Sequence, residues 1–407
     1  MNVLHIGKYF SPFSGGLENY MRDAMTALQR QGVNCAALVH RHALSLQTTS
    51  ETITSGYESF RVVRAAVWGR LLFTPLSPTF PRHLRRLIKR FKPDILHLHL
   101  PNPSAFWVLL LPAARRRPWV VHWHADVITA AQGWNMRLFY WLYRPFEQSL
   151  LRQASAIIVT SPPYLEASVP LRLWRKKCHV VPLGVDTARL DAFLAADQIR
   201  AGRRLRPDDD RRDGSLLRVL AVGRQTYYKG FRYLIEATAL FTGMRVDFVG
   251  SGDQAAELRA LAASLGVDGR IRFCGNLGDA ELLQHMQGCD CLCLPSIERT
   301  EAFGLVLLEA MYLGKATVVS DVPGSGMGWV VEDGVTGVKL PPADARALAG
   351  AFADLAGDRD KLVRLGDNGR AKFMREFGIG RGAEQLVRIY QDILRQTEAD
   401  RKDVSAR

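Results

Sequence analysis

Two glutamates in the C-terminal half are spaced so that each could bind a different hydroxyl group of one ligand. Glu301 precedes an apolar segment whose periodicity predicts a helix, and Glu309 lies inside it. Gly304, near the predicted helix start, lets a ligand approach the backbone closely, and free N–H groups there favour phosphate. We therefore expect Glu301 to reach a sugar and Glu309 a ribose; the alternative is that both merely flank a helix.

Two cations earlier in this half are placed to bind a diphosphate. Arg224 and Lys229 lie where a predicted strand ends and a helix begins. Arginine binds phosphate oxygens in bidentate fashion and lysine adds a point charge, so the pair could neutralise a departing diphosphate. Surface cations at a helix start are the alternative, although they would oppose the helix dipole. After the next strand, Gly250 and Gly252 permit a tight turn over a flat base.

The N-terminal half has a glycine pair and a histidine pair at comparable positions. Gly15 and Gly16 follow the first strand, where a ligand can meet bare backbone, but the third glycine of the dinucleotide fingerprint is missing. His122 and His124 alternate on one side of a strand exit. One of them should face a cleft, and we expect His122 to be structural.

Three other groups of residues could suggest a metal site, and we predict that none of them binds a metal. His97 and His99 have a ligand-like spacing without a cysteine or carboxylate set to complete a site. Asp208–Asp210 is predicted to be a solvated loop. Cys289, Cys291 and Cys293 alternate through 289–294, which favours a buried strand and reduced thiols.

The glutamate element resembles the signature of family 4 glycosyltransferases, which have the GT-B fold. The resemblance rests on Glu-x7-Glu, with Glu-Ala-Phe-Gly at its head and Gly314–Val319 behind it, and extends over nearly the whole chain. It implies a metal-free transfer of a sugar with retention of configuration. The catalytic residues that it implies are His124, Arg224, Lys229 and Glu301.

The resemblance also assigns the remaining site residues. It implies that the backbone at Gly15 and Gly16 lies against the donor phosphates and the incoming acceptor. The implied donor-binding residues are Gly15, Gly16, Gly250, Gly252, Leu277, Phe303, Gly304, Leu305 and Glu309. His99 and Asn102 are weaker candidates for binding the acceptor.

The elements that must position these residues alternate between strands and helices in both halves. An α/β fold is therefore expected, with two doubly wound Rossmann-like domains that face each other across a cleft holding the active site. The predicted strands are 3–7, 35–39, 95–98, 120–123, 157–160, 218–223, 246–250, 271–273, 291–294 and 316–319, with a helix at 18–31.

The 407 residues exceed what one core usually supports, so two domains are the default. Residues 1–183 are predicted to form an acceptor-binding domain and 216–378 a nucleotide-sugar-binding domain. Residues 184–215 are predicted to be a junction with a charged surface excursion from Asp197, and 379–407 a helix and tail, with a return to the N-terminal domain left open.

The net charge of +14 is concentrated in the N-terminal half. Residues 1–183 contain 23 basic and 8 acidic residues, whereas residues 216–407 contain 24 and 25. Such a field attracts nucleic acid, a membrane surface or a phosphate-bearing substrate. Cations interleave with apolar residues in segments suited to an anionic bilayer, with packed helix faces as the alternative; these segments are 68–73, 82–92, 115–117 and 172–177.

These features predict a hexosyltransferase of cell-surface glycan synthesis, with a nucleotide sugar as co-substrate and no cofactor. GDP-mannose is favoured over UDP-hexoses, and the acceptor is expected to be lipid-linked or a polysaccharide. The start shows no export signal, so we expect a cytoplasmic protein peripherally bound to the inner face of the cytoplasmic membrane. The alternatives are a GT-B epimerase or phosphorylase, a silent sugar-nucleotide sensor, and a basic nucleic-acid-binding protein, for which no module is recognisable.

Overall fold

The computed structural model describes residues 1–12, 15–55, 58–71, 74–127, 133–201 and 216–405. Three predicted features fall partly or wholly outside them: the first glycine turn at 13–14, the aromatic and basic loop at 72–73, and the excursion at 202–215 with Asp208–Asp210. The chain forms two compact units. Unit 1 contains Met1–Gly184 and Ile379–Arg407, and unit 2 contains Val185–Gly378.

Unit 1 is built on an eight-stranded sheet in the order β10-β9-β8-β7-β1-β2-β4-β3, in which only the β3–β4 pair is antiparallel. A separate hairpin joins β5 and β6. The strands are β1 (Asn2–Ile6), β2 (Asn34–His40), β3 (Thr49–Ser55), β4 (Glu58–Ala65), β5 (Gly69–Leu71), β6 (Thr74–Leu76), β7 (Ile95–Leu100), β8 (Trp119–Trp123), β9 (Ala156–Val159) and β10 (Cys178–Val180).

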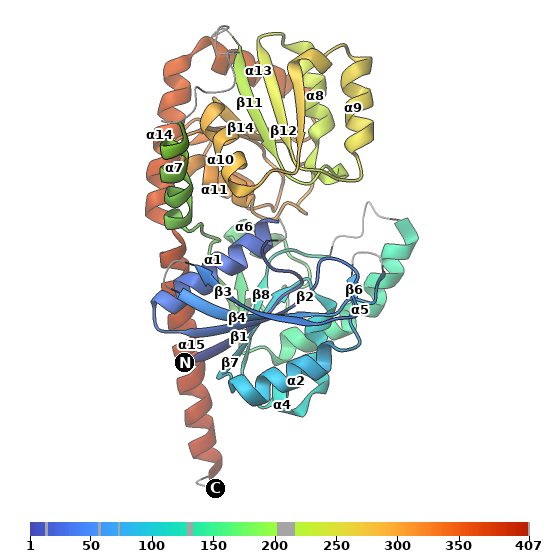
Figure 1. The fold of residues 1–407 in the computed structure, drawn as a ribbon, viewed down its shortest axis with the longest axis vertical. Coiled ribbons are helices and arrows are strands. Elements are labelled where there is room, and N and C mark those ends of the chain that lie inside the picture. Colours follow the sequence, from blue (N-terminus) through green and yellow to red (C-terminus); the bar gives the residue numbers. More distant parts are fainter. Residues whose placement is uncertain (13–14, 56–57, 72–73, 128–132, 202–215, 406–407) are drawn as a thin grey trace. The chain divides into compact units, whose positions relative to one another are not determined.

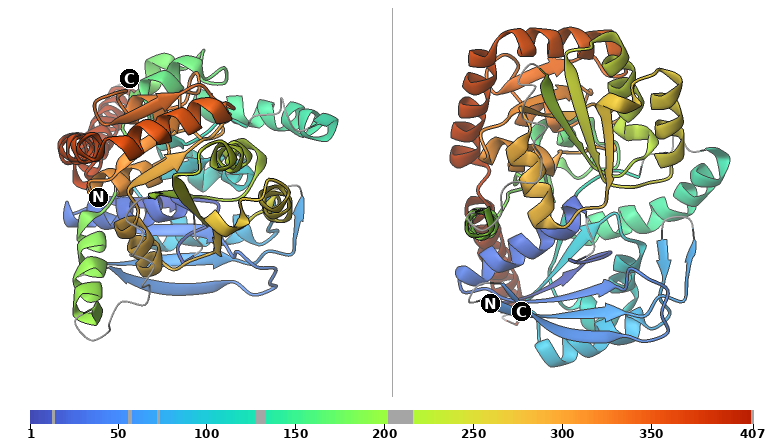
Figure 2. Two further views of the ribbon diagram at one scale, coloured as in Figure 1. Left: turned by 90° about the horizontal axis from the view of Figure 1, so that it is seen from above. Right: turned by 45° about the horizontal axis from the view of Figure 1, so that its top comes forward.

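Helices cover both faces of this sheet, which explains why β7, β8 and β9 are buried along their whole length. The helices are α1 (Gly16–Arg30), α2 (Phe80–Phe91), α3 (Trp107–Leu110), α4 (Pro112–Arg115), α5 (Gly133–Gln153), α6 (Pro162–Ala167) and α15 (Ile379–Ser405), with short 3-10 turns η1 (Pro103–Phe106) and η2 (Arg175–Lys177). In both views of Figure 2, the start of α5 extends away from the sheet of unit 1. Helix α15 packs beside α1, so the C-terminal segment is part of unit 1.

Unit 2 is a six-stranded parallel sheet in the order β13-β12-β11-β14-β15-β16. In chain order this is 3-2-1-4-5-6, the Rossmann arrangement, with a switch point between β11 and β14. The strands are β11 (Leu217–Val222), β12 (Met244–Val249), β13 (Ile271–Gly275), β14 (Cys291–Leu294), β15 (Ala316–Ser320) and β16 (Gly337–Leu340). β14 is fully buried but begins at Cys291, because Cys289 caps the preceding helix.

Figure 1 shows α8 and α9 on one side of this sheet and α11 and α14 on the other. The helices are α7 (Thr187–Ala201), α8 (Phe231–Leu240), α9 (Ala255–Ser264), α10 (Asp279–Gly288), α11 (Leu305–Tyr312), α12 (Met327–Val330), α13 (Ala345–Gly357) and α14 (Arg359–Glu376), with turns η4 (Tyr227–Lys229) and η5 (Asp268–Arg270). Helix α7 continues to Ala201, well into the stretch predicted to be a polar excursion. The prediction of an α/β fold with two Rossmann-like domains is confirmed.

Candidate functional site

The candidate donor site of unit 2 is formed by loops at the carboxyl ends of its central strands. The loop after β11 and the loop after β12 are joined by a hydrogen bond from Gln225 N to Ser251 O, 3.0 Å long. Gly250 has φ +123°, and a Cβ there would lie 2.1 Å from Gly223 O; a Cβ at Gly252 would lie 2.1 Å from Gln225 O. Both glycines are therefore required by backbone packing between two loops, independently of any bound base.

The predicted glutamate element begins in a loop after β14 and continues into α11. Gly304 is the N-cap of α11 at φ +80°, a conformation that favours glycine. Ser325 donates to the carbonyl oxygen of Glu301, and Gly326 N donates to Ala302 O at 2.7 Å, which fixes the backbone beside Glu301. Phe303 is buried against Trp329 and Phe377, so only its backbone is available to a donor.

Lys229 and Glu301 form an ion pair in which both side chains are nearly buried. Burial is the largest single effect and lowers the pKa of Lys229, but Glu301, by its charge and its hydrogen bond, and Tyr228 together outweigh it, so the pKa is raised above its usual value. Arg224 and Glu301 also act electrostatically on Tyr228, so Arg224, Lys229 and Glu301 belong to one charged group. Arg224 itself is exposed and can move toward an anion.

Glu309 is held by an arginine that the sequence did not indicate. Arg189 lies in α7, and its guanidinium reaches Glu309 Oε1 at 3.5 Å and Asp279 Oδ2 at 3.3 Å. Because 120 residues separate Arg189 from Glu309, no local spacing could have revealed the contact. Leu277 lies half-buried in the loop between β13 and α10, close in sequence to Asp279.

In unit 1, the two glycines predicted to contact the donor phosphates lie at the N-terminus of α1. Gly15 is the N-cap and Gly16 the first helical residue. The Glu18 carboxylate lies over Gly15, where a Cβ would be 2.1 Å from Glu18 Oε2. Burial raises the pKa of Glu18. A phosphate at this helix end would therefore have to displace or share the place of a carboxylate.

The two weaker acceptor candidates are buried. The Asn102 side chain accepts from Ser104 N at 3.2 Å and so caps the η1 turn. His99 is 2% exposed, and both of its ring nitrogens are hydrogen-bonded, to His5 at 3.1 Å and to His124 at 2.9 Å. Neither side chain is therefore accessible to an acceptor in this structure.

Five buried histidines stack on one face of three neighbouring strands, and we call them the histidine cluster: His5, His97, His99, His122 and His124. His5 pairs with His97 across β1 and β7, and His99 with His122 across β7 and β8. A second hydrogen-bonded chain runs from Tyr390 of α15 through His97 to His122. His122 and His124 lie on the same side, as predicted, with ring centroids 4.1 Å apart.

Burial lowers the pKa of every histidine in the cluster, to about 3 for His5. Contacts among the imidazoles reinforce the shift at the other four, because one charged ring disfavours a second. All five rings are therefore neutral at physiological pH. His124, the catalytic candidate, would act there as a neutral hydrogen-bonding group rather than as a cation.

Three sets of side chains bring ligand atoms within 4.8 Å of one another and could hold a metal. Two sets come from the histidine cluster, and the third joins Asp247, Cys274 and His285. In the two histidine sets, the ring nitrogens that face one another already pair with each other, as His5 does with His99, His97 with His122 and His99 with His124. Asp247 already pairs with Arg272 and with His285. We interpret all three sets as hydrogen-bond and ion-pair networks, and a metal-free site stays a prediction.

The predicted basic segments of unit 1 differ in whether their apolar side chains are exposed. In α2 the apolar side chains Phe80, Leu84, Leu87 and Ile88 are buried, so this helix presents mainly cations. Two other predicted segments do expose large apolar side chains, at Trp68, Leu71 and Leu173. Helix α5, which was not predicted, exposes four more, at Leu138, Trp141, Leu142 and Phe146. Among the described helices, none is both long enough and apolar enough to cross a bilayer.

Comparison with known proteins covers both units. The model of "Glycosyl transferases group 1" matches residues 207–372, and that of "Glycosyltransferase Family 4" matches residues 14–189. The chain is 28% identical to O-antigen chain mannosyltransferase C of Escherichia coli, over 97% of this chain and 99% of that protein. It is also 28% identical to D-rhamnosyltransferase WbpZ of Pseudomonas aeruginosa, over 93% and 92%. The fold matches sucrose-phosphate synthase from Thermosynechococcus elongatus with TM-score 0.76 and 24% identity, over 97% and 99% of the two chains.

Proposed function

Because this chain belongs to glycosyltransferase family 4, we propose that it transfers a hexose from a nucleotide-diphosphate sugar, with retention of configuration, to a lipid-linked or polysaccharide acceptor in cell-surface glycan synthesis. The observation that carries this proposal is the charged group at the carboxyl ends of β11 and β14. In this group, Lys229 forms an ion pair with Glu301. Glu301 lies in the loop before α11, and Glu309 lies just over one turn inside that helix.

The charges of this group suit a donor whose diphosphate leaves. Arg224 and Lys229 would offset the charge that grows on the nucleoside diphosphate as the glycosidic bond breaks. A sugar hydroxyl would then take the place of Lys229 as the partner of Glu301, and Glu309 would bind the ribose. No metal is required in this scheme, because the two cations supply the positive charge.

A mannose-type donor is supported by the names of the relatives. One is called an O-antigen chain mannosyltransferase and another a D-rhamnosyltransferase. We therefore propose GDP-mannose ahead of UDP-hexoses. The same names support an acceptor that belongs to a surface polysaccharide or to its lipid-linked precursor.

We propose that unit 1 binds this acceptor at the inner face of the cytoplasmic membrane. Its excess of basic residues attracts anionic lipid, and the exposed apolar residues on α5 recur at the three- and four-residue spacing of a single helix face. The α5 residues are Leu138, Trp141, Leu142 and Phe146. Together, cations and an apolar helix face give the two contributions that peripheral binding needs.

The donor is tested by thermal shift against GDP, UDP, ADP and their sugars, followed by product analysis with the nucleotide sugar that stabilises most. We expect GDP-mannose to stabilise the protein and mannose to appear in a glycan with retained configuration. Glu309→Ala should abolish the shift, whereas Glu257→Ala, an exposed glutamate of α9, should not. Turnover of free sugar phosphate, or no stabilisation by any nucleotide, would refute the proposal.

A further inference from the structure

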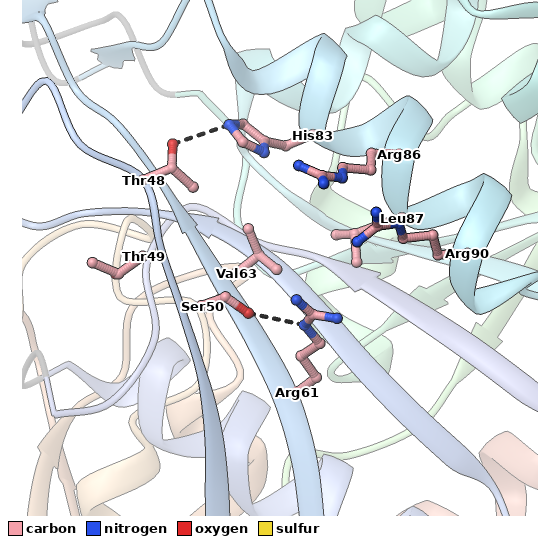
Figure 3. Close-up of a pocket in the computed structure, with 9 residues that line it drawn as sticks. All are labelled: Thr48, Thr49, Ser50, Arg61, Val63, His83, Arg86, Leu87 and Arg90. Atoms are coloured by element: carbon pink, nitrogen blue, oxygen red, sulfur yellow. Dashed lines mark hydrogen bonds between the residues drawn. The ribbon is translucent and has the colours of Figure 1, made fainter.

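Three arginines converge on a hollow of about 210 Å³ on the outside of unit 1. Arg61 comes from β4, and Arg86 and Arg90 come from α2, one helix turn apart. Figure 3 shows the three side chains around the hollow, with His83 at its upper end. We call this hollow the arginine pocket; its other lining residues are Thr48, Thr49, Ser50, Val63 and Leu87.

The lining of the arginine pocket contains no carboxylate. Arg61 donates from Nε to Ser50 Oγ at 2.9 Å, and Thr48 Oγ1 is 3.0 Å from His83 Nε2. Within the described part of the chain, no ion pair joins an acidic side chain to Arg61, Arg86 or Arg90. Three guanidinium groups around one hollow repel each other, so an anion there would be stabilised by all three.

The electrostatic effect of this arrangement is visible at His83. Its pKa is lowered, first by burial and then by the charges of Arg82 and Arg86. The pocket is therefore positive without an internal counter-charge. Two of its hydroxyl groups, those of Thr48 and Ser50, can donate to the same anion because a hydroxyl is both donor and acceptor.

We propose that the arginine pocket binds a phosphate group. A tetrahedral phosphate accepts bidentate hydrogen bonds from planar guanidinium groups, which a lysine-lined surface would not provide. The phosphate can be carried by a membrane lipid or by a soluble molecule, and the experiment below separates these sources. The pocket itself is independent of the proposed transfer reaction; only a lipid source rests on the proposed membrane-bound acceptor.

Helix α2 provides a charge-matched control. His83, Arg86, Leu87 and Arg90 recur at the spacing of one helix face and line the pocket. Arg85 and Lys89 are also exposed but do not line it. Arg86→Gln/Arg90→Gln and Arg85→Gln/Lys89→Gln therefore remove the same charge from the same helix, and only the first pair removes it from the pocket.

The test measures binding to two probes at fixed ionic strength. Glycerol 1-phosphate is titrated by calorimetry, and vesicles of phosphatidylcholine with or without phosphatidylglycerol are used in co-sedimentation. Equal thermal unfolding midpoints for the native protein and both double variants establish that each is folded. Neither assay requires glycosyl transfer, so failure of the proposed reaction leaves this test intact.

We expect Arg86→Gln/Arg90→Gln to weaken binding at least tenfold and Arg85→Gln/Lys89→Gln to weaken it less than threefold. A selective loss with vesicles alone assigns a lipid-borne phosphate, and a selective loss with glycerol 1-phosphate assigns a soluble one; both support the pocket. Equal losses in the two double variants would show diffuse attraction and overturn the proposal. Failure of the native protein to bind either probe would also overturn it.

Discussion

Acidification should unfold unit 1 selectively, because the histidine cluster must stay neutral in the folded protein. A histidine in the unfolded chain has its ordinary pKa of 6.5, whereas burial lowers the folded value for all five members. Below pH 6.5 the unfolded state thus binds more protons than the folded state. The resulting stability is fully present above pH 6.5 and is lost as the pH falls toward the folded pKa values.

The size of the effect follows from the number of rings. One pH unit below 6.5, each histidine that charges only on unfolding costs about 1.4 kcal/mol of stability. Five such histidines give roughly 7 kcal/mol at pH 5.5, against roughly 5–15 kcal/mol for the whole stability of a typical domain. We therefore expect unit 1 to be marginal at pH 5.5 while remaining folded at pH 7.5.

Hydrogen exchange read by mass spectrometry at pH 7.5, 6.5 and 5.5, corrected for intrinsic exchange, would resolve the two units. Peptides of β7 and β8 should lose protection, whereas those of β11 and β12 should keep it. The reason is that the described residues of unit 2 include one histidine, His285, which pairs with Asp247. An exposed control, His179→Gln, should leave the pH dependence unchanged. Equal protection of β7 at pH 7.5 and 5.5 would refute the reasoning.

Three substitutions test the donor site and its scaffold. Glu309→Gln should raise KM for the nucleotide sugar at least tenfold with a smaller change in kcat, as measured by initial rates, because it weakens ribose binding in ground and transition states alike. Lys229→Met should lower kcat by roughly 100- to 1,000-fold, as expected for loss of a charge that stabilises the leaving group, and should also lower the unfolding midpoint by leaving Glu301 without its partner. Gly250→Ala should cost more than 2 kcal/mol in denaturant unfolding, since its Cβ would meet backbone at 2.1 Å, whereas a Cβ at Gly288 meets nothing within 4 Å; Gly288→Ala is the control, and equal costs would contradict the packing argument.

The sequence predicted the central parallel strands because each is a short apolar run, largely buried between helices. It did not predict the parallel strands β4, β10 and β16, and both β10 and β16 are only partly buried. It did not predict β3, since Thr49–Ser55 is largely polar and forms the exposed antiparallel edge of the sheet. The donor loops were predictable because glycines and charges follow the strands directly. Arg189 was not, because its partner Glu309 lies on a different helix and the pairing depends on how α7 packs.

The histidine cluster was also only partly predictable from the sequence. The alternation of His97 with His99 and of His122 with His124 placed each pair on one face of its strand. The sequence alone could not align β1, β7 and β8, and so it missed that His5 joins them. The register across a sheet depends on the packing of the whole domain. Because of this register, His99, a candidate for binding the acceptor, is buried and hydrogen-bonded between His5 and His124.

This link determines which ring nitrogen of His124 carries the hydrogen. In the chain of His5, His99 and His124, the two end atoms, His5 Nε2 and His124 Nδ1, have no partner among the described residues. One end must therefore carry an unpaired N–H and the other an unpaired lone pair, and the N–H is the costlier group to bury. His124 is 8% exposed and His5 only 1%, so the N–H should lie on His124 Nδ1, at the less deeply buried end of the chain. Nitrogen-15 NMR of labelled histidine tests this: the Nδ1–H tautomer of His124 is expected, and His99→Phe should release it whereas His97→Phe should not. The Nε2–H tautomer in the native protein would contradict the assignment.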